Sequence, residues 1–380
     1  MITIKNGLVL VGFNLEAKKT NVIINDEGTI IKLSPHDEAG EIIDATGCIV
    51  MPAFINAHTH IGDAIAKDVG DGLSLDELVA PPNGLKHQLL NSATDAQLVD
   101  AMHEAAKEMM YNGISTFIDF REGGLHGIKL LKEAIYDLPI NACILGRSDK
   151  FYDPEVSADE IAMETRELLR NCDGIGLSGI ADMDYERILQ IADICNQEDK
   201  LIMIHAAEYY DLQEKAVQLT NQTEVELSLK AGISNLVHVT SPILTDLDLL
   251  SASAATVVSC PRSNGMLSSG MPPIAAYNEE GIDVALGSDN VMFNSPDMFR
   301  EMEYALKSSR GAYKNKITAH DILKMATING FKILGKDISI MEGNVSDILI
   351  IRQKSDDPYL SVVNRSSPED IMNFIMSNQM

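Results

Sequence analysis

Basic residues are scarce in this sequence. Its 380 residues include 30 lysines and arginines against 56 aspartates and glutamates, which gives a formal net charge of −26 at pH 7. A surface this negative repels the phosphate backbone of nucleic acids and anionic membranes. The acidic residues are spread along the chain, which is typical of a solubilising surface rather than a binding tail. We therefore exclude nucleic acids and membranes as partners.

Cysteines and long apolar runs are also few. The cysteines are odd in number, widely spaced and without a CxxC pair: Cys48, Cys143, Cys172, Cys195 and Cys260. This argues against a disulfide framework and a cysteine zinc site, and it suits a reducing compartment. The N-terminus, MITIKNGLVLVGF, does not resemble a signal peptide, and no run reaches the ~18 apolar residues of a membrane span. We expect a soluble, cytoplasmic protein.

What the sequence does contain is an alternation of short apolar runs with helical stretches. The runs are CIVMPAFI, ISTFIDF, INACILG, GIGLSGI, LIMIH, NLVHV, ATVVSC and DVALGS. The helical stretches include residues 95–111, 126–137, 157–171, 185–198 and 297–311. Apolar strands separated by helices indicate a parallel sheet covered on both faces, and eight of them suggest a closed barrel of about 250 residues. The sequence therefore predicts an α/β fold, a (β/α)8 TIM-like barrel over residues 51–336.

Three other segments differ from this rhythm. NVIINDEGTIIKL near the N-terminus and VSDILIIRQ near the C-terminus are β-branched runs, which indicates β structure at both ends. The connection over residues 61–94 is rich in Gly, Asp and Pro. Connections of that length in compact domains often form lids or binding loops.

Side chains that can bind a metal follow the apolar runs. His58 and His60 come after the first run, and their spacing of two points both side chains the same way from a strand. His205 closes the fifth run, His238 lies in the sixth, and Asp289 follows the eighth. Because the C-terminal ends of barrel strands surround one mouth, we expect these residues to converge there.

Each of these residues also has a plainer interpretation. A single histidine in an apolar run is more often a hydrogen-bonded core residue, and a Ser-Asp pair after a strand is usually a helix N-cap. Their coincidence at the same end of the strands favours a metal site. Three histidines and one aspartate suit zinc, or alternatively iron, and leave room for a water whose pKa the metal lowers to roughly 7.

Glu208 is the next candidate. In HAAE it stands three residues after His205, about one turn on if a helix begins there. It would then complement the helix dipole, or it would shuttle protons beside the metal.

These motifs together resemble the amidohydrolase superfamily, in the branch of aminohydrolases and chlorohydrolases that act on nitrogen heterocycles. HAAE is similar to that branch's HxxE, VVSCPRSN to its CPxSN motif, and LGSDN to its strand-eight aspartate. LKMATINGFKILG and MEGNVSDILII resemble its C-terminal helix and its return to a small β domain. The resemblance covers nearly the whole chain.

The resemblance implies a role for each residue. His58, His60, His205 and Asp289 would bind one divalent metal, and Asp289 would also take part in catalysis. His238 would hold or deprotonate the attacking water, and Glu208 would pass protons to the ring nitrogen and then to the leaving group. Residues 1–50 and 337–380 would form one discontinuous β-sandwich domain. Related enzymes are commonly homo-oligomers, so we expect one here.

Two features qualify the resemblance. The fourth run ends without the lysine that bridges two metals in cyclic-amide hydrolases, which disfavours a two-metal site. The substrate-reading residues are open: Arg121 and Arg147 end the second and third runs. Either they bind an anionic or carbonyl group of the substrate, or they pair with Glu122 or Asp149 at the rim. His87 is a weaker candidate.

Three functions fit the pattern. The first is hydrolytic deamination of a purine, pyrimidine, pterin or triazine, in which metal hydroxide attacks the ring carbon and Glu208 moves the protons. The second is release of chloride or another group by the same site. The third is a non-catalytic barrel, which would be expected to have lost some of the ligands.

Overall fold

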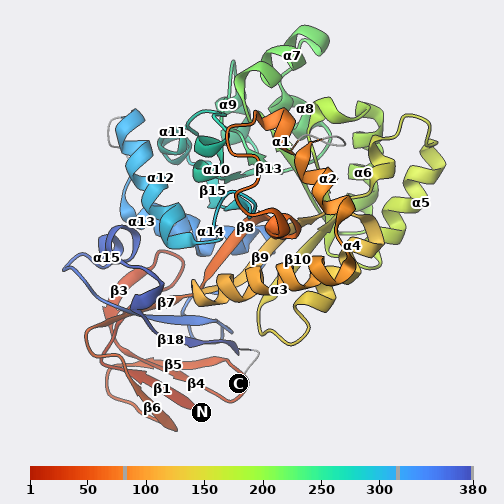
Figure 1. Cartoon of the computed structure of the whole chain (residues 1–380). Coiled ribbons are helices and arrows are strands. Elements are labelled where there is room, and N and C mark those ends of the chain that lie inside the picture. The colour runs from red at the N-terminus through yellow and green to blue at the C-terminus, as the bar shows by residue number, and fades with distance from the viewer. Residues whose placement is uncertain (80–83, 314–316, 378–380) are drawn as a thin grey trace.

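A parallel barrel forms the larger part of the molecule (Figure 1). The computed structural model describes residues 1–79, 84–313 and 317–377. In sheet order, the barrel strands are β8 (Phe54–His60), β9 (Ile114–Arg121), β10 (Asn141–Gly146), β11 (Gly174–Leu177), β12 (Leu201–Ala206), β13 (Asn235–His238), β14 (Thr256–Ser259) and β15 (Asp283–Leu286). Their parallel order along the chain confirms the predicted barrel.

The barrel closes through a short ninth strand. Directly after β15, β16 (Asp289–Asn290) pairs in parallel with β8, with Asp289 opposite Thr59 and Asn290 opposite His60. Closure therefore sets the aspartate that follows the last strand beside the two histidines that end the first.

Helices cover the outside of the barrel. The first is α3 (Asp95–Tyr111), whose bounds match the predicted helix; a capping box between Thr94 and Gln97 starts it, and Met102, Ala105 and Met109 are buried on one face. The other helices are α4 (Gly124–Ala134), α5 (Ala158–Leu169), α6 (Tyr185–Gln197), α7 (Tyr210–Thr220), α8 (Glu224–Lys230), α9 (Asp246–Ala252), α10 (Pro261–Met266), α11 (Ile274–Glu279), α12 (Met298–Tyr313), α13 (Ala319–Met325), α14 (Ile328–Ile333) and α15 (Pro358–Arg365). Among the described residues, no helix is both long enough and apolar enough to cross a membrane.

The long connection after β8 contains the 3₁₀ helix η1 (Ile61–Ala66), α1 (Leu75–Val79) and α2 (Leu85–Ser92). Residues 80–83 of this connection lie outside the described residues. In Figure 1, α1 and α2 lie beside the barrel end at which α8 and α9 are drawn. The connection is thus partly helical.

Both ends of the chain form a second unit of two sheets (Figure 1). One sheet has the order β5 (Ile30–Ser34), β4 (Asn21–Ile24), β1 (Ile2–Lys5), β6 (Glu41–Asp44). The other has the order β18 (Ile371–Ile375), β17 (Ile348–Arg352), β7 (Cys48–Pro52), β2 (Leu8–Val11), β3 (Glu16–Lys19). Side chains from both sheets, among them Ile4, Val22, Val50 and Ile348, share one apolar core.

The first predicted run, residues 48–55, is two strands rather than one. β7 pairs antiparallel with β17 in the terminal sheet, whereas β8 begins at Phe54 and enters the barrel. Both strands are largely buried, so the sequence stays apolar across Ala53, and nothing in it marks the end of one strand and the start of the next. The proposed domain boundary after residue 50 accordingly falls inside β7.

Candidate metal centre

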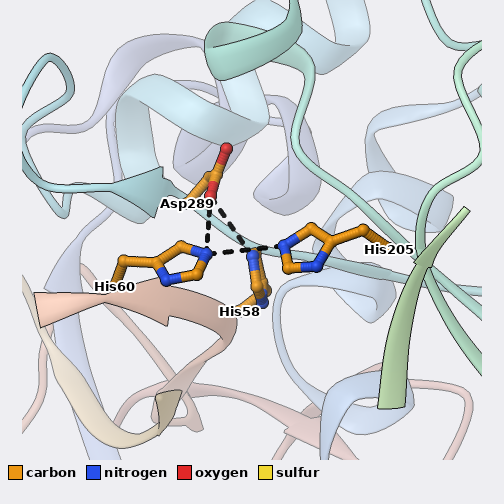
Figure 2. Close-up of side chains that lie close together, drawn as sticks. All are labelled: His58, His60, His205 and Asp289. Carbon is orange, nitrogen blue, oxygen red and sulfur yellow. Dashed lines mark hydrogen bonds and ion pairs between the residues drawn. The ribbon is translucent and has the colours of Figure 1, made fainter. Parts of the chain in front are cut away.

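Four side chains from four points of the barrel sequence meet at one place (Figure 2). His58 and His60 end β8, His205 lies in β12, and Asp289 begins β16. One ligand atom from each lies within 4.8 Å of the others, so the group can hold a metal ion. We call these four residues the ligand cluster.

Distances inside the cluster are short. Asp289 Oδ1 lies 3.2 Å from His58 Nε2 and 3.6 Å from His60 Nε2, and the Nε2 atoms of His60 and His205 are 3.4 Å apart. Burial lowers the pKa of all three imidazoles, that of His60 to about 3. Burial alone would raise the pKa of Asp289, but the surrounding histidines hold it well below its usual value. Neutral imidazoles and an ionised carboxylate are the forms that bind metals.

His58 gives a separate test of fit. Both of its ring nitrogens are buried without a hydrogen-bond partner among the described residues, although Nε2 is close to Asp289. Buried polar atoms are normally satisfied, and a metal ion would satisfy Nε2. Three nitrogen donors and one oxygen donor suit zinc in particular. The residues present therefore fit a divalent metal.

The Nδ1 atoms of the other two histidines of the cluster are held by neighbours. The Nδ1 atom of His60 lies 2.9 Å from Glu122 Oε1, and Nδ1 of His205 lies 2.9 Å from the carbonyl oxygen of Leu177. Such contacts fix which ring nitrogen points at a metal and raise its basicity.

Glu122 connects the ligand cluster to the long connection. Its Oε1 also forms an ion pair with Lys86, whose Nζ lies 2.8 Å away, and its Oε2 accepts a hydrogen bond of 2.7 Å from Arg121. Lys86, on α2, is 3% exposed. Burial would raise the pKa of Glu122, but Lys86, His60 and Arg121 hold it well below its usual value. The carboxylate therefore stays ionised behind His60.

His238 and Glu208 lie together beside the cluster. Glu208 Oε1 is 3.7 Å from His238 Nε2, and the stacked rings of His205 and His238 are 5.2 Å apart between centroids. No helix begins at HAAE, since α7 begins at Tyr210, so the condition for placing Glu208 in a first helical turn is not met. Ala207 has a left-handed backbone, with φ of 51°, which a right-handed helix cannot continue. Glu208 thus belongs to the turn after β12, not to the first turn of a helix.

A cavity of about 720 Å³ opens over the cluster, and we call it the main cavity. Its lining includes three of the cluster residues together with Glu208 and His238. A cavity with a few converging polar side chains is typical of a small-molecule site.

The two candidate arginines differ in position. Arg147 lines the main cavity and reaches Tyr152, Ser178 and Glu122. Arg121 lines a second cavity beside it, where its guanidinium is tied to Glu122. His87 also lines the second cavity and faces the carbonyl oxygen of Val79 at 3.2 Å.

A sequence model of the amidohydrolase family matches residues 49–376. The chain belongs to the amidohydrolase family. A relative from Methanothermobacter thermautotrophicus, provisionally named an aminohydrolase, is 44% identical over 100% of this chain and 99% of its own. A 5-methylthioadenosine/S-adenosylhomocysteine deaminase of Pyrococcus horikoshii is 27% identical, over 100% of this chain and 94% of its own.

Solved structures share the fold of this amidohydrolase. Atrazine chlorohydrolase from Arthrobacter aurescens, in complex with zinc, superposes with a TM-score of 0.86 over 100% of this chain and 94% of its own, at 18% identity. The chain is therefore a hydrolase of the amidohydrolase family with a group of side chains suited to a divalent metal.

In the structure of this amidohydrolase, the CPRSN segment contacts Asp289 and His238. Ser263 donates a hydrogen bond to Oδ2 of Asp289, and the Nδ2 atom of Asn264 lies 3.2 Å from Nδ1 of His238. The contacts of this motif were not predicted from the sequence. Lys86 was not among the predicted site residues, and Glu122 was considered only as a partner for an arginine, because no spacing along the chain links either residue to His60.

Proposed function

We propose that this amidohydrolase hydrolytically removes an amino group from a nitrogen heterocycle of the purine, pyrimidine, pterin or triazine type. The observation that carries the proposal is the pair formed by Glu208 and His238, which lines the main cavity directly beside the ligand cluster. A carboxyl group and an imidazole in this position can hold a water and move its protons, as exchange of an amino group for oxygen requires.

The relatives support this reaction class. The 27% identical relative from Pyrococcus horikoshii is named a deaminase of 5-methylthioadenosine and S-adenosylhomocysteine, and the 44% identical relative carries the name aminohydrolase. Both alignments cover the whole of this chain. We carry over the reaction class and leave the substrate to experiment.

Each side chain has a role in the proposal. His58, His60, His205 and Asp289 would hold one divalent metal, with zinc the expected ion. When bound, the metal would supply Lewis-acid activation of the attacking water. His238 would orient this water through Nε2, while Asn264 holds its Nδ1. Glu208 would take a proton from the water and deliver it to the ring nitrogen. It would then carry the proton of the added hydroxyl group to the departing amino group, which leaves as ammonia while the ring carbon keeps the oxygen.

The competing reaction is release of chloride, which the superposed chlorohydrolase performs on the same fold. Chloride leaves without a proton, so an intact proton carrier at Glu208 favours deamination.

The test is product release by zinc-loaded protein. We would incubate it with adenosine, adenine, guanine, cytosine, a pterin and atrazine, and measure ammonia and chloride. Ammonia from at least one amino-substituted ring is expected; chloride from atrazine without ammonia from any ring would contradict the proposal.

Replacing Glu208 with Gln separates the proton carrier from a structural residue. Turnover should fall by about 10²–10⁴, the usual worth of general acid–base catalysis, while zinc content and melting temperature stay unchanged. Near-normal ammonia release from this variant would refute the assigned role.

A further inference from the structure

Glu224 is a second carboxyl group in the main cavity, and the mechanism above does not use it. It is the first residue of α8 and only 1% exposed. It lines the same cavity as His205 and Glu208.

The two oxygens of Glu224 have different surroundings. Oε2 accepts a hydrogen bond of 2.8 Å from the backbone N–H of Ala207 and so braces the left-handed turn between His205 and Glu208. Oε1 is buried and has no hydrogen-bond partner among the described residues. A buried acceptor without a donor is costly, and because Glu224 lines a binding cavity, a donor group of a ligand could satisfy it.

The start of α8 does not explain Glu224. Thr223 already caps this helix by accepting a hydrogen bond from the N–H of Glu226. Glu226, in the same first turn, points elsewhere: it pairs with Lys230 at 2.8 Å. Thr223 thus caps the helix and Glu226 supplies a negative charge near its N-terminus, so neither role requires Oε1 of Glu224.

The main cavity has two electrostatic sides. Its cationic lining residues, Lys86 and Arg147, lie over the arc from β9 to β10, where both reach Glu122. Its carboxyl groups outside the cluster, Asp182, Glu208 and Glu224, follow β11 and β12. Hydrogen-bond donors of a ligand are therefore favoured on the β11–β12 side.

Burial is the main reason why the pKa of Glu224 is raised to about 7; the Ala207 N–H opposes this rise, and the charges of Asp182 and Glu208 add to it. A ligand donor at Oε1 would offset the cost of the ionised form.

We propose that Glu224 is a specificity-determining residue whose Oε1 accepts a hydrogen bond from an N–H or O–H group of the substrate away from the reacting carbon. The inference rests on the proposed function. The donor is either an exocyclic amino group on the ring or a hydroxyl of an attached sugar. Substrates without such a group should be poor ones, because Oε1 then stays buried and unpaired.

Matched pairs of compounds test the two donor sources. Adenosine against 2′,3′-dideoxyadenosine removes the sugar hydroxyls, and 2,6-diaminopurine against adenine removes a second ring amino group. We would measure kcat/KM for ammonia release by zinc-loaded wild type, Glu224→Gln and the control Glu226→Gln. The Gln side chain at position 224 can still accept from Ala207 while its amide NH2 replaces the free acceptor.

The wild type should prefer the donor-bearing member of one pair by about 10²-fold or more, as sites built around a substrate hydrogen bond do. Glu224→Gln should reduce this ratio to below about tenfold, mainly through KM, with zinc content unchanged; Glu226→Gln should keep it. Glu224→Asp, which retains the charge but withdraws it by one methylene, should also weaken the preference.

Two results would overturn the inference: a wild type without preference in either pair, or a Glu224→Gln protein that keeps the wild-type ratio. If no compound releases ammonia, the proposed function fails on its own. Thermal shifts of the zinc-loaded proteins with the same pairs then decide the inference. A larger shift with the donor-bearing member, lost in Glu224→Gln, supports it, and equal shifts refute it.

Discussion

At the scale of single residues, Glu122 should control how tightly the metal is held. Glu122→Gln removes the charged acceptor behind His60 Nδ1 and leaves Lys86 buried without its closest partner. Zinc affinity should fall by about 10–100-fold, the usual effect of losing a carboxylate that orients a histidine ligand. Competition with a chromophoric chelator measures this affinity.

Asp246 offers the control. Asp246 is fully buried and accepts hydrogen bonds from Thr223 and Gln213, but it does not line the main cavity. Asp246→Asn should lower stability and leave zinc affinity unchanged. Equal losses of affinity in both variants would mean that Glu122 acts only through general stability.

The same residues show what the sequence could and could not reveal. The positions of the ligand cluster were predictable because each ligand follows an apolar strand, and parallel strands end at one mouth. The contact of Lys86 with Glu122 was not, since it depends on how the connection over residues 61–94 folds back. Nor could the sequence show that Arg147 lines both cavities, whereas Arg121 lines the second one.

At the scale of elements, Gly287 between β15 and β16 permits the barrel to close. A Cβ atom there would lie 2.8 Å from both Cβ and the backbone nitrogen of His58, inside contact distance. Gly287→Ala should push β16 away from β8, moving Asp289 relative to His58. We expect weaker zinc binding and a lower melting temperature; calorimetry with and without zinc measures both.

Gly311 on α12 is the matched control, because a Cβ atom there meets nothing within 4 Å. Gly311→Ala should be neutral or stabilising by up to about 1 kcal/mol, the helix propensity difference. A Gly287→Ala protein that behaves like this control would show that the strands tolerate separation.

The bounds of a helix or strand were predictable where a local sequence signal, such as a cap, marks its end. The helix over 95–111 has a cap and a regular apolar face, and its bounds match. Two boundaries in the structure have no such local signal in the sequence. The break between β7 and β8 follows from which sheet each half joins, and the late start of α7 follows from the φ angle of Ala207.

At the scale of the whole molecule, pH should affect stability through buried carboxyl groups such as Glu301. Burial raises its pKa to about 7, and Arg262 only partly opposes this. Between pH ~4.5 and ~7 the folded state keeps a proton that the unfolded chain releases, so stability falls as pH rises through this window. From pH 5 to pH 7.5 the loss from this one group is about 2 kcal/mol.

Glu301→Gln should remove that share of the pH dependence. Unfolding free energies of both proteins at pH 5 and pH 7.5, from urea titration, measure the difference. The unfolding free energy of the variant should rise relative to that of the wild type as pH rises. If the difference between the two unfolding free energies is the same at both pH values, the pKa of Glu301 is not raised by folding.

Association of chains is the remaining prediction at this scale. We expect homo-oligomers, as the resemblance to aminohydrolases implies. The net charge of −26 opposes contact between copies, so added salt should strengthen it. Light scattering at low and high salt should give masses above the 41.5 kDa of one chain, and a mass of one chain in both would exclude the prediction.

The terminal sheet has a consequence for how the chain is made. β7 lies between β2 and β17, and β17 begins about 300 residues after β7 ends. At ribosomal speeds of about 5–20 residues per second, β7 leaves the ribosome some 15–60 s before its partner exists. During that interval its apolar edge is open to other nascent chains. We expect this protein to need chaperones most while its barrel is still being translated.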